Sequence, residues 1–230
     1  MAYAKIAEQS EQSKKVTRIL IAVLVAIILA ITCLALAPTV LAMTVREYRV
    51  ISGIGEPIQT EVKAGVLRLG GDTWSGSAKY VAEYRIKGLV IGVDHYLSGS
   101  LYDRVSPLDI SLAWGEAAAH NNLIRWQRGN RQMEAKVSRM AEWIIGEQAS
   151  KIFTQYSNNH IIVDDDTLRN KLMNVSVGDY IELSGYLVDI TVHDKDDQLA
   201  YYELKSSLRR DDNGDNSCEV LYVTRMEQLD

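Results

Sequence analysis

The longest hydrophobic stretch of the chain is residues 19–37, which contain no charged residue. As a helix, these 19 residues reach about 28 Å, and the core of a bilayer is roughly 30 Å thick. The hydrophobic cores of secretory signals are shorter, at about 7–15 residues. The pattern therefore predicts a membrane-spanning segment over residues 16–42, which separates a tail of residues 1–15 from an exported domain of residues 43–230.

A cleaved secretory signal is the alternative interpretation of the same stretch, because Val-Leu-Ala at residues 40–42 offers a small-residue cleavage site. In the spanning interpretation, Lys14, Lys15 and Arg18 precede the stretch and hold the N-terminus on the cytoplasmic side. Both interpretations export residues 43–230. The favoured one places a single-pass protein in the inner (cytoplasmic) membrane, with its tail inside.

Alternating hydrophobic and polar residues predict that the exported part is rich in strands. The pattern is longest at residues 79–96 and 180–192, and Gly88 should mark a bulge or a bend in the first of these strands. Gly185 in the second marks a bulge or a close approach of two backbones. Shorter strands are expected at residues 45–51, 61–69, 200–208 and 218–225. We therefore expect an α+β domain with mainly antiparallel strands, and a small closed barrel of the oligonucleotide/oligosaccharide-binding (OB) type is the preferred form.

Turn-forming residues divide the middle of the chain. Gly129 and Asn130 lie between two segments of mixed polarity and predict a hairpin over residues 123–137. A helix over residues 117–128 is the alternative. Other expected elements are a turn at residues 106–109 and short helices at residues 147–156 and 165–174.

The charge of the exported part argues against nucleic acid as a partner. Without the four basic and two acidic residues that precede residue 43, 21 basic and 28 acidic residues remain, which gives a formal charge of −7. A net negative domain is repelled by phosphate backbones. The two cysteines are Cys33 in the hydrophobic stretch and Cys218 near the C-terminus. We expect no disulfide between them, and we expect Cys218 to be a small buried core residue.

No motif specific for catalysis, for a cofactor or for a metal follows the hydrophobic stretch. Asp-Asn-Gly-rich residues 211–215 look like a calcium loop, but their glycine is at the fourth position where an EF-hand needs it at the sixth. We therefore expect no cofactor and no metal site. The candidates for acid–base chemistry are Asp109, His160, Asp211 and Asp212. The candidates for ligand binding are Trp114, Arg209 and Arg210.

The last third of the chain holds a distinctive series of short motifs. They are Val177-Gly178-Asp179, residues 183–188, Ser206-Ser207-Leu208, Arg210-Asp211-Asp212, Gly214 and Cys218-Glu219. Three further motifs lie upstream: residues 106–109, Trp114-Gly115 and Ser157-Asn158-Asn159-His160. Together they resemble an uncharacterised family of bacterial membrane-associated proteins, although residues 116–145 depart from its pattern. The resemblance implies a bacterial membrane protein and carries no activity with it.

Two functions remain as hypotheses. The leading one is a binding or scaffold protein of the cell envelope, held at the lipid bilayer and joined to protein partners in a larger assembly. The competing one is a membrane-anchored hydrolase that uses Asp109, His160 and the loop with Asp211 and Asp212. The distances between these side chains discriminate: convergence within about 4–6 Å in a cleft favours the hydrolase.

Overall fold

The computed structural model describes residues 14–15, 17–32, 54–197, 199–209 and 217–229. It divides into two compact units, Met1–Glu47 and Tyr48–Asp230, and each is described by itself. In the first unit, the described residues form a helix. Within the described ranges no helix has the length and apolar character needed to cross a bilayer. Residues 33–42 of the predicted spanning segment and the predicted strand at residues 45–51 lie outside the described residues.

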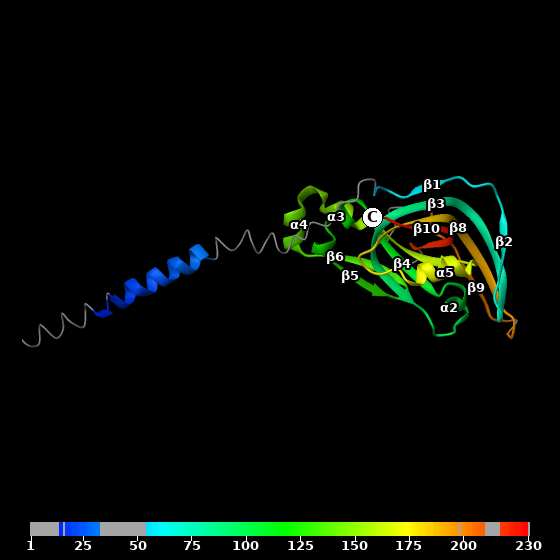
Figure 1. Cartoon of the computed structure of the whole chain (residues 1–230), viewed down its shortest axis with the longest axis horizontal. Coiled ribbons are helices and arrows are strands. Elements are labelled where there is room, and N and C mark those ends of the chain that lie inside the picture. The colour runs from blue at the N-terminus through cyan, green and yellow to red at the C-terminus, as the bar shows by residue number, and fades with distance from the viewer. Residues whose placement is uncertain (1–13, 16, 33–53, 198, 210–216, 230) are drawn as a thin grey trace, which may run out of the picture. The chain divides into compact units, whose positions relative to one another are not determined.

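The second unit is built around one large, mostly antiparallel sheet (Figure 1). Its strands are β1 (Ile58–Thr60), β2 (Val66–Gly70), β3 (Trp74–His95), β4 (Leu108–Ala113), β7 (Tyr156–Ile162), β8 (Tyr180–Asp194), β9 (Tyr201–Leu204) and β10 (Glu219–Gln228). Helices and a two-stranded hairpin of β5 (Ile124–Gly129) and β6 (Gln132–Val137) are added to this sheet. The expectation of an α+β domain with mainly antiparallel strands is confirmed.

Five strands close into a ring of hydrogen bonds, in the order β3–β4–β7–β10–β8 and back to β3. The ring closes because β3 is long enough to have two partners: Trp74 to Leu89 pair with β8, and Leu89 to His95 pair with β4. All pairs in the ring are antiparallel except β7 with β10, which is parallel. One apolar cluster takes residues from all five strands and fills the ring, with Leu112, Ile161 and Leu183 among its members.

The register shifts of β3 do not occur at Gly88, the position that the sequence indicated. Register shifts occur between Tyr80 and Ala82 and between Val90 and Gly92. Gly88 remains in register, so no bulge occurs at this residue. A glycine is needed at position 88 because a Cβ atom there would be 2.8 Å from the carbonyl oxygen of Ala113.

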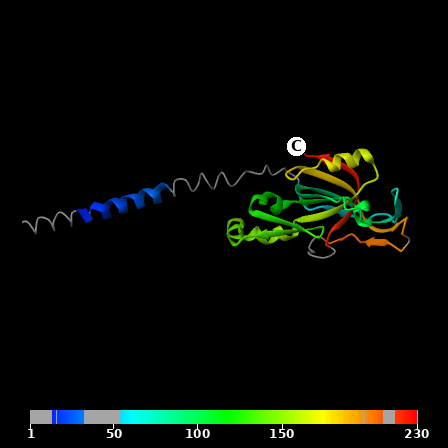
Figure 2. The same ribbon diagram turned by 90° about the horizontal axis from the view of Figure 1, so that it is seen from below.

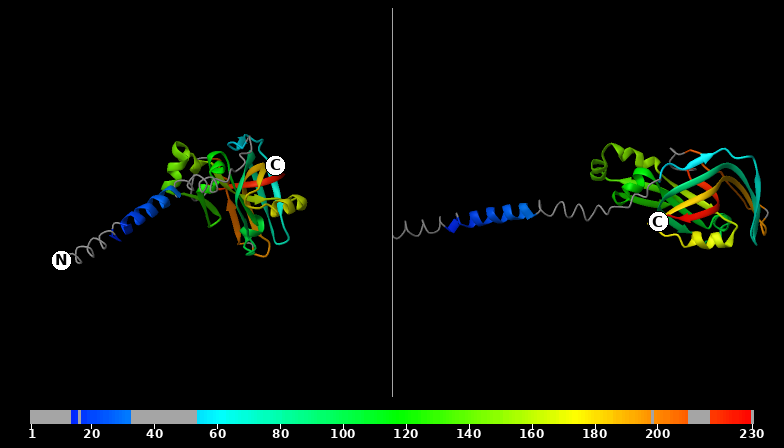
Figure 3. Two further views of the ribbon diagram at one scale, coloured as in Figure 1. Left: turned by 60° about the vertical axis from the view of Figure 1, so that its left-hand side comes forward. Right: turned by 45° about the horizontal axis from the view of Figure 1, so that its top comes forward.

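The helices lie on different sides of the strands (Figures 2 and 3). They are α2 (Leu101–Val105), α3 (Gly115–Ala119), α4 (Arg139–Ile145), α5 (Asp166–Met173) and the 3₁₀ helices η1 (Asn121–Leu123) and η2 (Gly146–Thr154). The predicted helix at residues 165–174 is confirmed as α5, whose first turn is capped by the Asp165 carboxylate at 2.6 Å from the Leu168 amide nitrogen. Leu172 of α5 is fully buried in the cluster that fills the ring.

A long insertion between β4 and β7 contains α3, the hairpin, α4 and η2, and it has its own apolar cluster. The predicted hairpin is confirmed, and the alternative helix over residues 117–128 is wrong. The two-residue turn is Asn130-Arg131, one position later than predicted, with φ of 50° and 60°. Both positive values are typical of a type I′ turn. The predicted turn at residues 106–109 is also wrong in part, because Leu108 and Asp109 already belong to β4.

Candidate functional site

Two of the predicted site residues lie side by side on neighbouring strands. Asp109 of β4 is opposite His160 of β7 in the antiparallel register. The Nδ1 atom of His160 is 2.9 Å from Oδ1 of Asp109, so the ring N–H donates a hydrogen bond to the carboxylate. Asp109 is 1% exposed and His160 is 4% exposed. The two side chains therefore lie within the distance that the hydrolase hypothesis requires, but other side chains bury them.

Arg131 is one of the side chains that bury Asp109. Its Nη2 atom donates to Oδ1 of Asp109 at 2.9 Å, and its Nη1 atom donates to Oδ1 of Asp103 at 2.9 Å. The guanidinium lies between two aromatic rings, those of Tyr96 and Tyr102, with its carbon 3.8 Å from each ring centroid. A cation in this position is attracted by the negative faces of both rings. The turn at the tip of the hairpin thus delivers a positive charge to the buried carboxylate.

Asn158 completes the cluster, which we call the Arg131 hub: Asp109, Arg131, Asn158 and His160. The Nδ2 atom of Asn158 donates to Oδ2 of Asp109 at 3.2 Å and to the carbonyl of Arg131 at 2.8 Å. Its Oδ1 atom accepts from the Ser111 hydroxyl at 2.7 Å. Buried polar groups are stable only when they are hydrogen-bonded, and the hub meets this condition.

The hub sets the protonation state of Asp109. Burial by itself raises the pKa of this carboxyl, but the hydrogen bonds and charges of His160 and Arg131 outweigh burial and hold the pKa below its usual value. Burial, with the nearby Asp109 carboxylate, raises the pKa of Tyr96, and burial raises that of Tyr102. Both phenols therefore remain protonated, and Asp109 remains ionised, throughout the neutral pH range.

The lowered pKa of Asp109 predicts an acid-sensitive contribution to stability. An unfolded aspartate has a pKa of about 3.9, so the contribution is complete above that pH and is lost as the pH falls through the lower folded value. Between about pH 4 and pH 2, the free energy of unfolding should fall more steeply for the wild type than for Asp109→Asn. The exposed Asp72→Asn should keep the wild-type slope, and parallel curves for the wild type and Asp109→Asn would contradict the prediction. Urea unfolding at a series of pH values measures these slopes.

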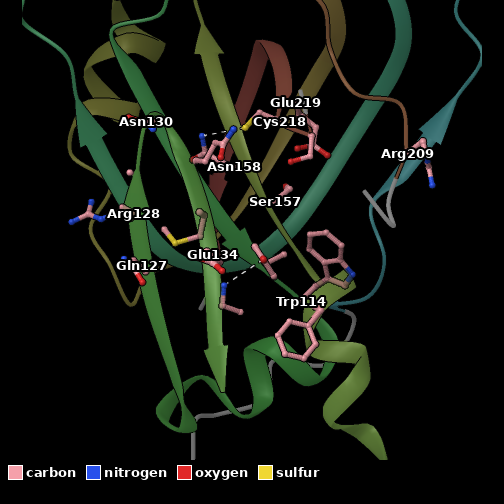
Figure 4. Close-up of a pocket in the computed structure, with 17 residues that line it drawn as sticks. Trp114, Gln127, Arg128, Asn130, Glu134, Ser157, Asn158, Arg209, Cys218 and Glu219 are labelled. Carbon is pink, nitrogen blue, oxygen red and sulfur yellow. Dashed lines mark hydrogen bonds between the residues drawn. The ribbon is translucent and has the colours of Figure 1, made fainter. Parts of the chain in front are cut away.

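A pocket of about 390 Å³ lies next to the hub and shares Asn158 with it. Its aromatic lining is Trp114, Phe153 and Tyr156, and its polar lining includes Gln127, Arg128, Asn130, Gln132, Glu134, Ser157, Arg209, Ser217 and Glu219. Figure 4 shows Trp114, Ser157 and Glu219 around one space, although they come from different segments. This volume lies within the roughly 300–1,000 Å³ that small-molecule pockets have.

Local backbone geometry holds Trp114 at the base of this pocket. Its amide nitrogen donates to the carbonyl of Gln155 at 2.9 Å, directly after β4 ends. Gly115 then turns the chain with a φ of +52°, where a Cβ atom would be 2.6 Å from the Gln155 side chain. Trp114 is 2% exposed, so it forms a wall of the pocket and presents little of its indole to solvent.

The pocket and the hub divide the predicted site residues between them. Trp114 and Arg209 line the pocket, whereas Asp109 and His160 are not among its lining residues. Arg210, Asp211 and Asp212 lie outside the described residues. Cys218 is buried, as predicted, and its sulfur is 3.9 Å from Nδ2 of Asn158. Within the described part of the chain, no group of three or more His, Cys, Asp or Glu residues could hold a metal ion.

Comparisons with protein-family models, with curated proteins and with solved structures found no match. The resemblance of the C-terminal motifs to a bacterial membrane-associated family therefore stays a prediction.

Sequence reasoning missed Arg131, the residue around which the hub is organised. The hairpin contains several arginines, and nothing in the alternation of the chain distinguishes Arg131 from Arg125 or Arg128. Only the structure shows its place in the two-residue turn, where it has a positive φ, which is uncommon for a residue with a side chain. Such an outlier persists where the surrounding contacts enforce it, and the contacts here are those with Asp103 and Asp109.

Proposed function

We propose that the protein is a membrane-anchored binding protein of the cell envelope, with a ligand site in the pocket beside Trp114. The domain is proposed to be an OB-like barrel. In chain order, the ring strands β3, β4, β7, β8 and β10 are the first to the fifth, and their order in the ring is 1-2-3-5-4 with α5 between the third and the fourth. A five-stranded Greek-key arrangement of this kind is typical of OB folds.

The position of the pocket is the observation that carries the proposal. OB folds bind ligands on the face of the second and third strands, next to the loops after the first and the fourth. Here the pocket is lined by β7, the third strand, and by Arg209 and Ser217 from the connection between the fourth and fifth strands. This fold type binds oligonucleotides or oligosaccharides, and the net charge of −5 disfavours the former.

The lining favours a hydroxyl-rich ligand. Aromatic rings such as Tyr156 pack against the C–H faces of sugar rings, and the amides of Gln127 and Asn130 can both donate to and accept from hydroxyl groups. We therefore propose an oligosaccharide as the ligand class. The envelope location and a protein partner within a larger assembly remain part of the proposal, motivated by the hydrophobic stretch at residues 19–37 and by the absence of a catalytic motif in the sequence.

Titration calorimetry of the full chain in detergent with a tetramer of N-acetylglucosamine tests this site. Gln127→Ala should weaken binding about 3- to 10-fold, because one hydrogen bond contributes about 0.5–1.5 kcal/mol. Gln228→Ala, an exposed glutamine of β10 that is not in the pocket lining, is the matched control and should bind as the wild type does. Binding of single-stranded DNA without binding of the oligosaccharide would contradict the proposal.

The hydrolase hypothesis retains one specific observation, the hydrogen bond between Asp109 and His160. A general acid or base must come within about 2.6–3.2 Å of the proton that it transfers. Arg131 and Asn158 occupy the positions next to the Asp109 carboxylate, which favours a structural role for the pair. Hydrolysis of the tetramer during the titration, lost in Asp109→Asn, would favour the hydrolase.

A further inference from the structure

Helix α4 is hydrophobic on two opposite faces. Its seven residues read Arg-Met-Ala-Glu-Trp-Ile-Ile, and Ala141 and Ile145 point into the apolar cluster of the insertion. On the outer side, Met140, Trp143 and Ile144 are 65%, 79% and 45% exposed. A surface helix normally places its apolar residues on one stripe that faces the core, whereas α4 also exposes apolar side chains on its outer side. We call these three residues the α4 face.

The α4 face differs from the other exposed apolar side chains of this domain. Single exposed leucines or valines are normal on protein surfaces and need no explanation. Met140, Trp143 and Ile144 are spaced at i, i+3 and i+4, which places them together on one side of the helix. A contiguous patch of this kind marks an interaction surface.

The length of the connecting segment in the sequence and the place where the described part of the domain begins point to the occupant. Residues 38–53 join the hydrophobic stretch to the first described residue of the domain, Ile54, and these 16 residues span at most about 55 Å when extended. In Figures 1 and 3, the first described residues of the domain (cyan) start at the end of the strands where α3 and α4 (green) lie. The described part of the domain therefore begins on the side that carries the α4 face.

The register of the strands agrees with this placement. Ile58 of β1 pairs with Arg85 of β3 in an antiparallel register, so the chain before Ile58 runs towards Leu89. Leu89 pairs with Ala113, which immediately precedes Trp114 and α3. Helix α3 contacts η2, which continues directly from α4.

We propose that the α4 face docks on the surface of the bilayer that holds the N-terminal hydrophobic stretch, with Trp143 at the level of the lipid headgroups; this rests on the anchor in the proposed function. Tryptophan is enriched at membrane interfaces because its ring is apolar and its N–H is polar. Helix α4 carries one charge of each sign, Arg139 and Glu142. Docking therefore depends on apolar area and changes little with salt.

Quenching of tryptophan emission by brominated lipids tests the docking in the full chain. The four tryptophans are Trp74, Trp114, Trp126 and Trp143, so the hydrophobic stretch contains none and the signal reports on the domain alone. The wild type, reconstituted in phosphatidylcholine bilayers, should lose more emission with brominated acyl chains than with plain chains, also at high salt. Trp143→Phe should remove most of this difference. The matched control Trp74→Phe, at the first residue of β3, should retain it.

The outcomes separate the anchor from the α4 face. A chain that resists alkaline extraction but shows no quenching of Trp143 overturns the docking and leaves the anchor intact. A chain that alkaline extraction removes from the bilayer overturns both. If quenching is absent and Trp143→Glu converts a dimer to a monomer in size-exclusion chromatography, the face is occupied by a second copy of the chain and the lipid proposal is wrong.

Discussion

Arg131→Met should lower the free energy of unfolding by about 3–5 kcal/mol, the cost of removing one partner from a buried ion pair. The substitution leaves the Asp109 carboxylate, which is 1% exposed, without the guanidinium 2.9 Å away. It also removes the cation between Tyr96 and Tyr102. Urea unfolding of the full chain in detergent, followed by far-UV circular dichroism, measures the loss.

Arg128→Met is the matched control for this prediction. Arg128 belongs to the same hairpin and pairs with Asp94 at 2.7 Å, but its side chain is 45% exposed. Exposed pairs of this kind contribute about 0–1 kcal/mol, because water and salt screen them. Adding Asp109→Asn to Arg131→Met should recover part of the loss, since the double variant no longer buries an unpaired charge. Equal effects of the two arginine substitutions would show that the hub does not stabilise the fold.

The second large effect is expected at Gly185 of β8, which lies opposite Val223 of β10. A Cβ atom at this position would be 2.0 Å from the carbonyl oxygen of Tyr222. The obstacle is backbone, so it cannot rotate away as a side chain would. Gly185→Ala should therefore cost about 3 kcal/mol, at the upper end of overpacking effects, and should weaken the closure of the ring. The same unfolding measurement detects it.

Gly129→Ala serves as the control for Gly185→Ala. No atom lies within 4 Å of the Cβ position at Gly129, which is the last residue of β5. Its free energy of unfolding should stay within about 0.5 kcal/mol of the wild-type value. A Gly185→Ala variant as stable as Gly129→Ala would mean that the two strands can separate locally without opening the ring.

Much of the local structure was predictable, because it depends on short-range patterns. Alternation predicted the strands that became β3 and β8, and an acidic N-cap predicted α5. The sequence also indicated that Gly185 marks either a bulge or a close backbone approach, and the structure shows both: the close approach at Gly185 and a register shift between Val223 and Arg225 of the strand opposite it. Strand bounds and turn positions were less accurate, as at residues 106–109, since the pairing partner decides where a strand begins.

The candidate site was predictable only in part. Asp109 and His160 were named as candidates for acid–base chemistry, and Trp114 and Arg209 as binding candidates. Their partition into a hub and a pocket depends on register: β4 and β7 pair so that Asp109 is opposite His160, and the hairpin folds back to place Arg131 against Asp109. A sequence pattern does not show which distant segment packs over a given face of a strand.

Trp114 and Trp143 illustrate which properties follow from the sequence and which follow only from the tertiary structure. The sequence alone determined only that both residues belong to the α+β domain that follows a long hydrophobic stretch. Only the tertiary structure decided that Trp114 is 2% exposed at the base of a pocket, whereas Trp143 is 79% exposed on α4. The reason is physical: local periodicity sets the direction in which a side chain points from its helix or strand, but burial depends on what the rest of the chain brings to that side.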